Sequence, residues 1–173
     1  QVGDTAEPIT DLLSVLPMFD TARRLLVNYE ACRQLAWAAL EDAAQEGIDY
    51  VELRFSPLFM AEMHGLDPLS VTAAVCEAWE EAQRNLPLQS RLIVIMSRTY
   101  GPEACQVELA AAVAHRERGV VGVDLAGDEA RFPAHLFVEH YRQARAAGLH
   151  LSAHAGEFAA AESVRQAILL LGA

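Results

Sequence analysis

The 173-residue sequence contains no lysine, so all 13 of its basic residues are arginines, against 24 acidic residues. The net charge is −11, and the arginines form no basic cluster. This balance argues against nucleic acid or an anionic membrane surface as a partner, because both require a patch of positive charge. The chain also lacks a Ser/Gly-rich linker and low-complexity tracts, which predicts a single domain.

Long hydrophobic runs are missing as well. The longest apolar runs, at 92–96 and 167–171, are far too short to span a membrane. The first seven residues carry two acids and no base, which is unlike a secretory signal. Only three cysteines are present, widely separated and without a C-x-x-C pair, which predicts reduced core thiols in a cytoplasmic protein.

Strand and helix signals alternate along the chain. The strands are predicted at residues 50–55, 92–96, 120–125 and 149–153. Between them, Asp67 followed by Pro68 predicts the start of one helix, Pro102 and Pro133 predict the starts of two others, and Gly148 predicts a helix end. Strand starts roughly 30 to 40 residues apart are typical of βα units that build a parallel sheet.

Two α/β architectures share this period, the doubly wound sheet and the (β/α)8 TIM barrel. In the first predicted strand, Glu52 and Arg54 alternate with apolar residues. Because a barrel interior takes inward side chains in layers, this alternation favours the (β/α)8 TIM barrel, with about four of its βα units present. Glu52 and Arg54 are expected to form an inward-facing ion pair.

Polar residues gather where the predicted strands end, which is the edge where parallel α/β proteins carry their chemistry. The segments are 54–57, 97–99, 124–129 and 154–157. If these strands are neighbours, the four segments face a single crevice. Arg98, in the second segment, fits either ligand binding or a buried polar network.

Two of these segments hold candidate functional residues. His154 at a strand end can ligate zinc, and Glu157 beyond a glycine turn can act as a general acid. The structural alternatives are a core histidine and a glutamate placed at a helix N-terminus. Gly127 allows close backbone approach, so its N–H can donate to a ligand; the alternative is an ordinary loop in which Asp128 or Glu129 caps the next helix.

The strand-end segments resemble those of the adenosine deaminase family, in that family's order and spacing. The matching strings are YVELRFSP at 50–57, IMSR at 95–98, DLAGDE at 124–129 and HAGE at 154–157. The resemblance implies a (β/α)8 barrel of the metal-dependent hydrolase type with one Zn²⁺ per complete domain. It also implies conversion of adenosine or 2′-deoxyadenosine and water to inosine or 2′-deoxyinosine and ammonia, in purine salvage.

The resemblance further implies roles for individual residues. His154 matches a zinc ligand, Glu157 matches the residue that protonates the purine at N1, and Gly127 matches the glycine whose N–H binds the purine at N3. The expected partner is therefore a small purine nucleoside. A related aminopurine substrate (adenine or a modified adenosine) and a non-catalytic degenerate relative stay open as alternatives, and the oligomeric state stays unassigned.

Parts of the family's pattern have no counterpart in the sequence. The family's His-x-His pair on its first strand, a later histidine and an Asp-Asp pair are missing. Residues 1–173 are therefore expected to be the central part of a single barrel domain, inactive alone because a catalytic zinc needs about three protein ligands. Val15, Leu16 and Phe19 match an apolar lid near the substrate, with helix core as the alternative.

Overall fold

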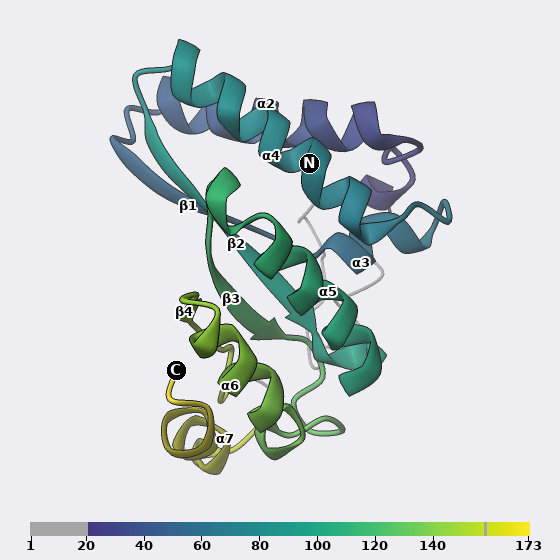
Figure 1. Cartoon of the computed structure of the whole chain (residues 1–173), viewed down its shortest axis with the longest axis vertical. Helices are drawn as coiled ribbons and strands as arrows, with labels where there is room; N and C mark the ends of the chain where they lie inside the picture. The colour runs from purple at the N-terminus through teal and green to yellow at the C-terminus, as the bar shows by residue number, and fades with distance from the viewer. Residues whose placement is uncertain (1–20, 158) are drawn as a thin grey trace, which may run out of the picture.

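The computed structural model of the chain describes residues 21–157 and 159–173, so Val15, Leu16 and Phe19 of the predicted lid lie outside the described residues. Strands and helices alternate along the described chain (Figure 1). The elements are α2 (Tyr29–Gln45), β1 (Tyr50–Phe55), α3 (Pro57–Glu62), α4 (Pro68–Asn85), β2 (Gln89–Ser97), η1 (Arg98–Tyr100), α5 (Pro102–Ala114), η2 (Arg116–Arg118), β3 (Val120–Ala126), η3 (Ala134–Phe137), α6 (Val138–Ala146), β4 (His150–Leu151), α7 (Ala161–Gln166) and the π-helical turn η4 (Ala167–Leu171).

The four strands form one parallel sheet in the order β1-β2-β3-β4. This order follows the chain, without the reversal that defines a doubly wound sheet. Sequential parallel strands joined by helices are the order of a (β/α)8 barrel. The structure therefore confirms the parallel α/β class and the barrel-type order that the sequence favoured.

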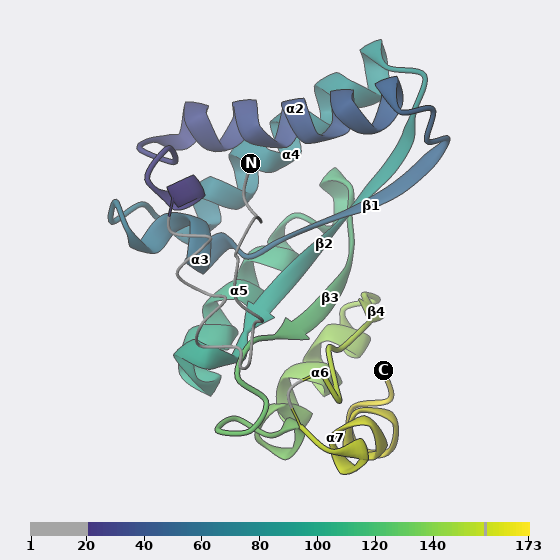
Figure 2. The ribbon, with the colours of Figure 1, turned by 180° about the vertical axis from the view of Figure 1, so that it is seen from behind.

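Helices cover one face of the sheet. α5 lies in front of β2 in Figure 1, and Figure 2 shows the same strands from the opposite face. The core between these layers is apolar, with Leu92, Val94 and Leu125 from the strands and Cys105 and Leu109 from α5 all buried. Each leucine removed from water contributes roughly 1.5–3 kcal/mol, so this layer supplies much of the driving force that holds the strand ends in place.

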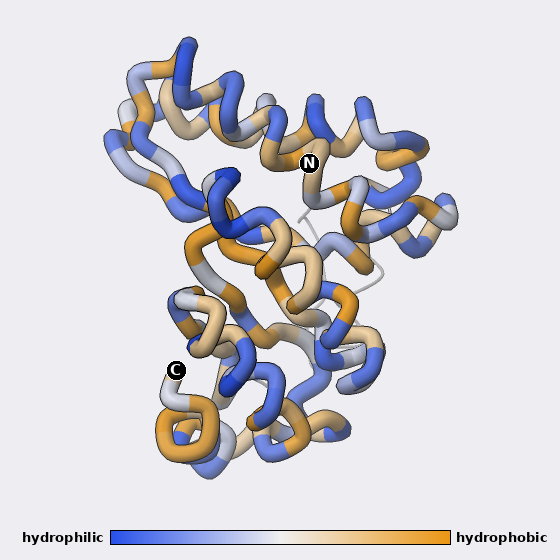
Figure 3. The backbone as a smooth tube through the Cα atoms, in the orientation of Figure 1, coloured by the Kyte–Doolittle hydropathy of each residue, from blue (hydrophilic) through white to orange (hydrophobic). Residues whose placement is uncertain are grey.

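Apolar residues also reach the surface near the C-terminus. Figure 3 shows hydrophobic colour along the central strands and again at η4. In η4, Ile168, Leu169 and Leu170 are 57, 64 and 45% exposed.

Among the described residues, none of the helices combines the length and the apolar character needed to cross a membrane.

Helix boundaries follow the local signals in the sequence. The Asp67 side chain accepts a hydrogen bond from the Ser70 N–H at 2.8 Å, and Pro68 occupies the first turn of α4. Pro102 opens α5 in the same way. Gly148 follows α6 with φ +80°, a left-handed conformation that costs glycine little. A side-chain cap of the Asp67 type contributes about 1 kcal/mol.

Several elements differ from the prediction in length. β2 extends beyond the predicted 92–96 at both ends, whereas β4 contains only His150 and Leu151 of the predicted 149–153. The helix predicted from Pro133 begins as the 3₁₀ turn η3 before α6. Residues 161–171 are divided between the helix α7 and the π-helical turn η4.

The predicted ion pair between Glu52 and Arg54 is wrong. Arg54 Nη1 lies 3.2 Å from Oδ2 of Asp124, so the arginine reaches across β2 to β3. Glu52 is exposed and instead accepts a hydrogen bond from the Tyr50 hydroxyl at 2.7 Å. Asp124 is fully buried and gains more from a cation than a solvated glutamate does.

The three cysteines are buried free thiols, as predicted. Burial raises the pKa of each of them, Cys32, Cys76 and Cys105. A buried thiol with a raised pKa is a poor nucleophile and a poor metal ligand. These residues therefore act as small apolar core residues.

Candidate active site

A cavity of about 480 Å³ opens at the carboxyl ends of the strands. Each strand or the loop that follows it contributes to the lining, with Phe55 from β1, Ser97 from β2, Gly127 directly after β3, and His154 and Glu157 beyond β4. The structure therefore brings Gly127, His154 and Glu157, the three candidate site residues, to one cavity. Its volume lies within the usual range for small-molecule sites.

The wall of this cavity is apolar toward the N-terminal side of the chain. Leu26, Leu35, Phe59, Met60 and Ile95 line it. Apolar walls with a few polar groups are typical of small-molecule pockets. The cavity thus combines an apolar side with a polar rim built from the loops after β3 and β4.

Gly127 has a backbone conformation that requires glycine. Its φ is +106°, and a Cβ at this position would collide with Thr99 Oγ1. The same Thr99 oxygen accepts a hydrogen bond from the Asp128 N–H at 3.0 Å, which braces the loop after β3. In the described part of the chain, the Gly127 N–H donates no hydrogen bond. The loop therefore presents a backbone donor at a lining residue of the cavity.

His154 is held at both backbone groups. Its N–H donates to the Leu125 carbonyl at 3.0 Å, and its own carbonyl accepts from Arg98 Nη2 at 2.7 Å. The first bond continues the pairing of the β4 segment with β3 beyond the end of β4. These two bonds fix the residue at the edge of the sheet, as the strand-end prediction requires.

The imidazole of His154 faces a buried carboxylate. Its Nδ1 lies 2.8 Å from Oδ2 of Asp124, which is fully buried and also contacts Arg54. With this carboxylate beside Nδ1, the ring's other nitrogen, Nε2, is the one left for a ligand. The His154 side chain is 39% exposed, so a ligand can reach the ring.

Two buried polar atoms at this position lack hydrogen bonds to the described residues. They are Asp124 Oδ1 and His154 Nδ1, whose close approach to Oδ2 lacks hydrogen-bond geometry. Polar atoms without hydrogen-bond partners beside an accessible imidazole are consistent with part of a metal site. A catalytic zinc takes about three protein ligands, however, and the described residues hold no group of three or more candidate ligands. They therefore fit only part of a zinc site.

Arg98 belongs to a buried network, which decides between the two interpretations of this residue. It is 1% exposed, and its Nη2 donates to the carbonyls of Leu125 at 3.1 Å and His154 at 2.7 Å. Its Nη1 approaches the Phe132 carbonyl at 3.4 Å. Burial lowers the pKa of Arg98, although Glu129 and other nearby groups oppose this shift. The guanidinium ties the loops after β3 and β4 together behind the cavity.

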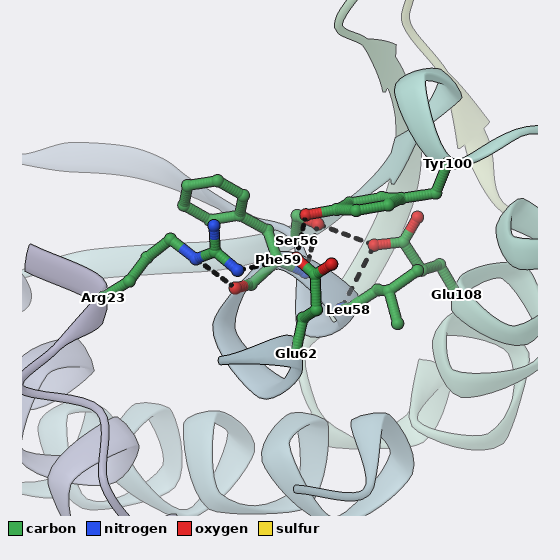
Figure 4. Close-up of polar contacts among 7 residues, drawn as sticks. All are labelled: Arg23, Ser56, Leu58, Phe59, Glu62, Tyr100 and Glu108. Atoms are coloured by element: carbon green, nitrogen blue, oxygen red, sulfur yellow. Dashed lines mark hydrogen bonds and ion pairs between the residues drawn. The ribbon is translucent and has the colours of Figure 1, made fainter. Parts of the chain in front are cut away.

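Glu108 is the polar residue at this edge that the sequence interpretation missed. It lies on α5 and is fully buried, with its carboxylate directed at Ser56 and Leu58, which follow β1 (Figure 4). Oε1 accepts from Ser56 Oγ at 2.6 Å and from the Leu58 N–H at 3.2 Å, and Oε2 accepts from the Ser97 N–H at 2.6 Å. Burial raises the pKa of Glu108 to about 7, against the lowering effect of these hydrogen bonds.

A sequence signal for Glu108 did exist. It shares the buried face of α5 with Cys105, Leu109 and Ala112, at the spacing of three and four residues that marks a core-facing helix stripe. An acid in such a stripe requires hydrogen-bond partners in the core. The signal indicates that a buried carboxylate exists, but it does not identify its partners.

A second polar cluster joins the N-terminal described residues to α3 (Figure 4). Arg23 donates from Nε to the Phe59 carbonyl at 3.1 Å and from Nη2 to Glu62 at 2.6 Å, and its guanidinium lies 4.4 Å from the centre of the Phe59 ring. The Tyr100 hydroxyl donates to the same Glu62 oxygen at 2.7 Å. Burial, followed by this hydrogen bond, raises the pKa of Tyr100. The cluster connects α3 and η1 beside the cavity.

A parallel sheet whose strands follow chain order, with a polar-rimmed cavity at its carboxyl edge, is typical of the class of (β/α)8-barrel proteins. The family model described as adenosine deaminase matches residues 3–173. The chain belongs to the adenosine deaminase family.

Named relatives agree with this assignment. The chain is 51% identical over 163 residues to an adenosine deaminase of Klebsiella pneumoniae and 48% identical over 163 residues to one of Escherichia coli. Each match covers 94% of this chain and 49% of the relative. The chain thus spans about half the length of the relatives that it matches.

Solved structures resemble the fold over a similar share. A zinc-bound amidohydrolase from Burkholderia ambifaria superposes with a TM-score of 0.85 at 30% identity, covering 99% of this chain and 46% of that protein. An adenine deaminase from Arthrobacter aurescens superposes with a TM-score of 0.82 at 24% identity, covering 95% of this chain and 50% of that one. The second likeness is evidence for the fold alone.

Proposed function

We propose that the chain contributes the adenine-binding and proton-donating side of an enzyme that hydrolyses adenosine and 2′-deoxyadenosine to inosine and 2′-deoxyinosine, with release of ammonia. The observation that carries the proposal is that Gly127, His154 and Glu157 line one cavity in a member of the adenosine deaminase family. Relatives near 50% identity that carry the name adenosine deaminase support adenosine over other aminopurines as the substrate.

The chain is proposed to be the central part of a single barrel domain rather than a domain by itself. A (β/α)8 barrel needs about 250 residues and eight strands; the described residues form four strands, and the chain has 173 residues. The exposed apolar residues of η4, Ile168, Leu169 and Leu170, support a further packing partner at that end.

Two residues are assigned direct contacts with the purine. The Gly127 N–H donates to ring N3, for which its conformation and missing side chain leave room. Glu157 delivers a proton to ring N1, which withdraws electrons from C6 and prepares that carbon for attack by water. Glu157 suits this role because it stands on the rim of the cavity, where a bound purine edge can reach it.

Zn²⁺ is the proposed cofactor, with His154 Nε2 as one of its ligands. The support is the imidazole held beside Asp124 and the zinc-bound amidohydrolase that shares the fold. The described residues supply only part of a zinc site.

The proposal extends to the setting of the reaction. A nucleoside deaminase of this type belongs to purine metabolism, and a cytoplasmic location is proposed with it. The buried free thiols of Cys32, Cys76 and Cys105 support a reducing compartment. The expected partner is a small purine nucleoside, and the net charge of −11 supports neither nucleic acid nor an anionic membrane as a partner.

The test uses the intact protein that contains this chain. Loss of adenosine absorbance and release of ammonia are measured with adenosine, 2′-deoxyadenosine, adenine and an N6-modified adenosine. Adenosine and 2′-deoxyadenosine are expected to react fastest. Glu157→Gln is expected to lower kcat by about 100-fold or more, because an amide cannot deliver a proton to N1. A preference for free adenine would select the alternative substrate class, and no turnover of any compound would favour the non-catalytic alternative.

A further inference from the structure

Glu129 is a buried acid beneath the loop that carries His154 and Glu157. It follows β3, and it is only 5% exposed. Its Oε2 accepts a hydrogen bond from the Gly156 N–H at 2.9 Å and another from the Ser163 hydroxyl of α7. One carboxylate therefore joins the loop after β3, the loop after β4 and the first turn of α7.

The peptide that Glu129 holds directly precedes Glu157. β4 ends at Leu151, so the sheet no longer fixes the backbone at Gly156. Gly156 has φ +77°, and a Cβ there would collide with Val164 of α7. Inside a protein a hydrogen bond is electrostatically stronger than in water. The bond to Glu129 is therefore a strong restraint on the direction in which the chain leaves Gly156.

The position of Glu157 depends on this restraint, because its own side chain forms no contact in the described chain that would hold it in place. It is exposed, and its carboxylate makes no hydrogen bond or ion pair with the described residues. Its place at the cavity is set by the backbone before it. That backbone is held at His154 by Arg98 and at Gly156 by Glu129.

We propose that Glu129 is a positioning residue for Glu157, which it serves by accepting the hydrogen bond from Gly156. This inference rests on the proposed function, in which Glu157 protonates the purine. The role requires an oxygen at the reach of a glutamate side chain and does not require a negative charge. Length and charge can therefore be separated by substitution.

The test compares three single variants of the intact protein. Glu129→Asp keeps the carboxylate, but its shorter side chain moves the accepting oxygen away from the Gly156 N–H. This variant is expected to lower kcat by about 100-fold with KM changed less than about 3-fold. Glu129→Gln keeps an oxygen that can accept both hydrogen bonds, and it is expected to retain most of kcat. Glu162→Gln is the matched control. Glu162 is an exposed acid in the first turn of α7, next to the Ser163 whose hydroxyl donates to Glu129.

A double-mutant cycle with Glu157 distinguishes positioning from general damage. In a Glu157→Gln background, Glu129→Asp is expected to cause no further loss of kcat, because the group that it positions is already absent. An equal fold-loss in both backgrounds overturns the proposal, and so does a Glu129→Asp variant with wild-type kcat. Near-normal turnover of Glu157→Gln alone refutes the proposed function instead, so the two failures are distinguishable.

Folding is checked by circular dichroism and thermal unfolding of each variant. If Glu129→Asp does not fold, hydrogen exchange of the Gly156 amide in the wild-type protein decides the question. Slow exchange is expected for an N–H bonded to a buried carboxylate. Exchange at the rate of an open loop amide overturns the proposal.

Discussion

The buried carboxylate of Glu108 predicts an unusual dependence of stability on pH. Its pKa in the folded protein is raised to about 7 from 4.5, with burial as the largest cause. None of its three hydrogen-bond donors, Ser56 Oγ, Leu58 N–H and Ser97 N–H, carries a positive charge. Between these two pH values the folded state therefore binds a proton that the unfolded state has released.

The sign and size of the effect follow from this shift. A raised pKa stabilises the folded protein fully below pH about 4.5, and this stabilisation is lost as the pH rises through about 7. Each pKa unit corresponds to about 1.4 kcal/mol, so Glu108 accounts for a loss of about 3 kcal/mol across this range. Glu108→Gln has no ionisable group and lacks this loss.

The measurement is urea unfolding of the intact protein and of Glu108→Gln at several pH values from about 4 to about 8. The stability difference between them is expected to move by about 3 kcal/mol in favour of the glutamine variant as the pH rises. In Glu108→Gln the side-chain amide nitrogen replaces a carboxylate oxygen that accepts from a backbone N–H. The lost hydrogen bond lowers the stability of the variant by about 1–3 kcal/mol at every pH. Because that cost is constant, it cancels from the change with pH.

Glu103→Gln serves as the control, since Glu103 is exposed on the first turn of the same helix and its substitution removes the same charge from α5. A stability difference between Glu108→Gln and the wild type that stays constant over the whole range refutes the reasoning. It would mean that Glu108 is ionised to the same extent in the folded and unfolded states. A shift of the same size for Glu103→Gln would assign the effect to helix charge instead of burial.

Three further predictions concern the site. His154→Ala is expected to lower zinc affinity of the intact protein by at least about tenfold, measured by metal analysis after dialysis, whereas His150→Ala, on an exposed strand position, keeps its zinc. Gly127→Ala is expected to raise KM for adenosine and to lower the free energy of unfolding in urea by about 2 kcal/mol, since Gly127 combines φ +106° with a Cβ collision at Thr99. Gly148→Ala is the control: Gly148 has φ +80° but open space around it, so this variant measures the backbone cost alone and leaves KM unchanged. The 173-residue chain expressed alone is expected to show no adenosine turnover and to retain no zinc, and robust turnover by it would contradict the assignment as part of a larger barrel.

Local signals were sufficient to predict most of the secondary structure. Asp67 with Pro68, and Pro102, mark helix starts through capping and the fixed φ of proline, neither of which depends on the rest of the fold. β4 was predicted too long because its regular pairing with β3 covers two positions, and only single hydrogen bonds from Ser152 and His154 continue beyond them. Strand length is set by the neighbouring strand, which a local pattern does not contain.

The candidate site was predictable for a related reason. Each strand is followed by a polar segment, and parallel strands in sequence order bring such segments to one edge. Gly127, His154 and Glu157 could therefore be expected to meet. Val15, Leu16 and Phe19 lie outside the described residues, and their lid role stays a prediction.

The sequence by itself determined where helices and strands begin and which residues stand at the strand ends, because capping, proline geometry and apolar periodicity act over a few residues. Only the tertiary structure decided which buried groups are paired. Arg54 meets Asp124 across 70 residues of chain, Glu108 meets Ser56 across 52, and Glu129 holds Gly156 across 27. These contacts depend on strand register and on the packing of helices against the sheet. A buried charged or polar group pairs with whichever group lies near it in space, and its position in the chain does not specify that group.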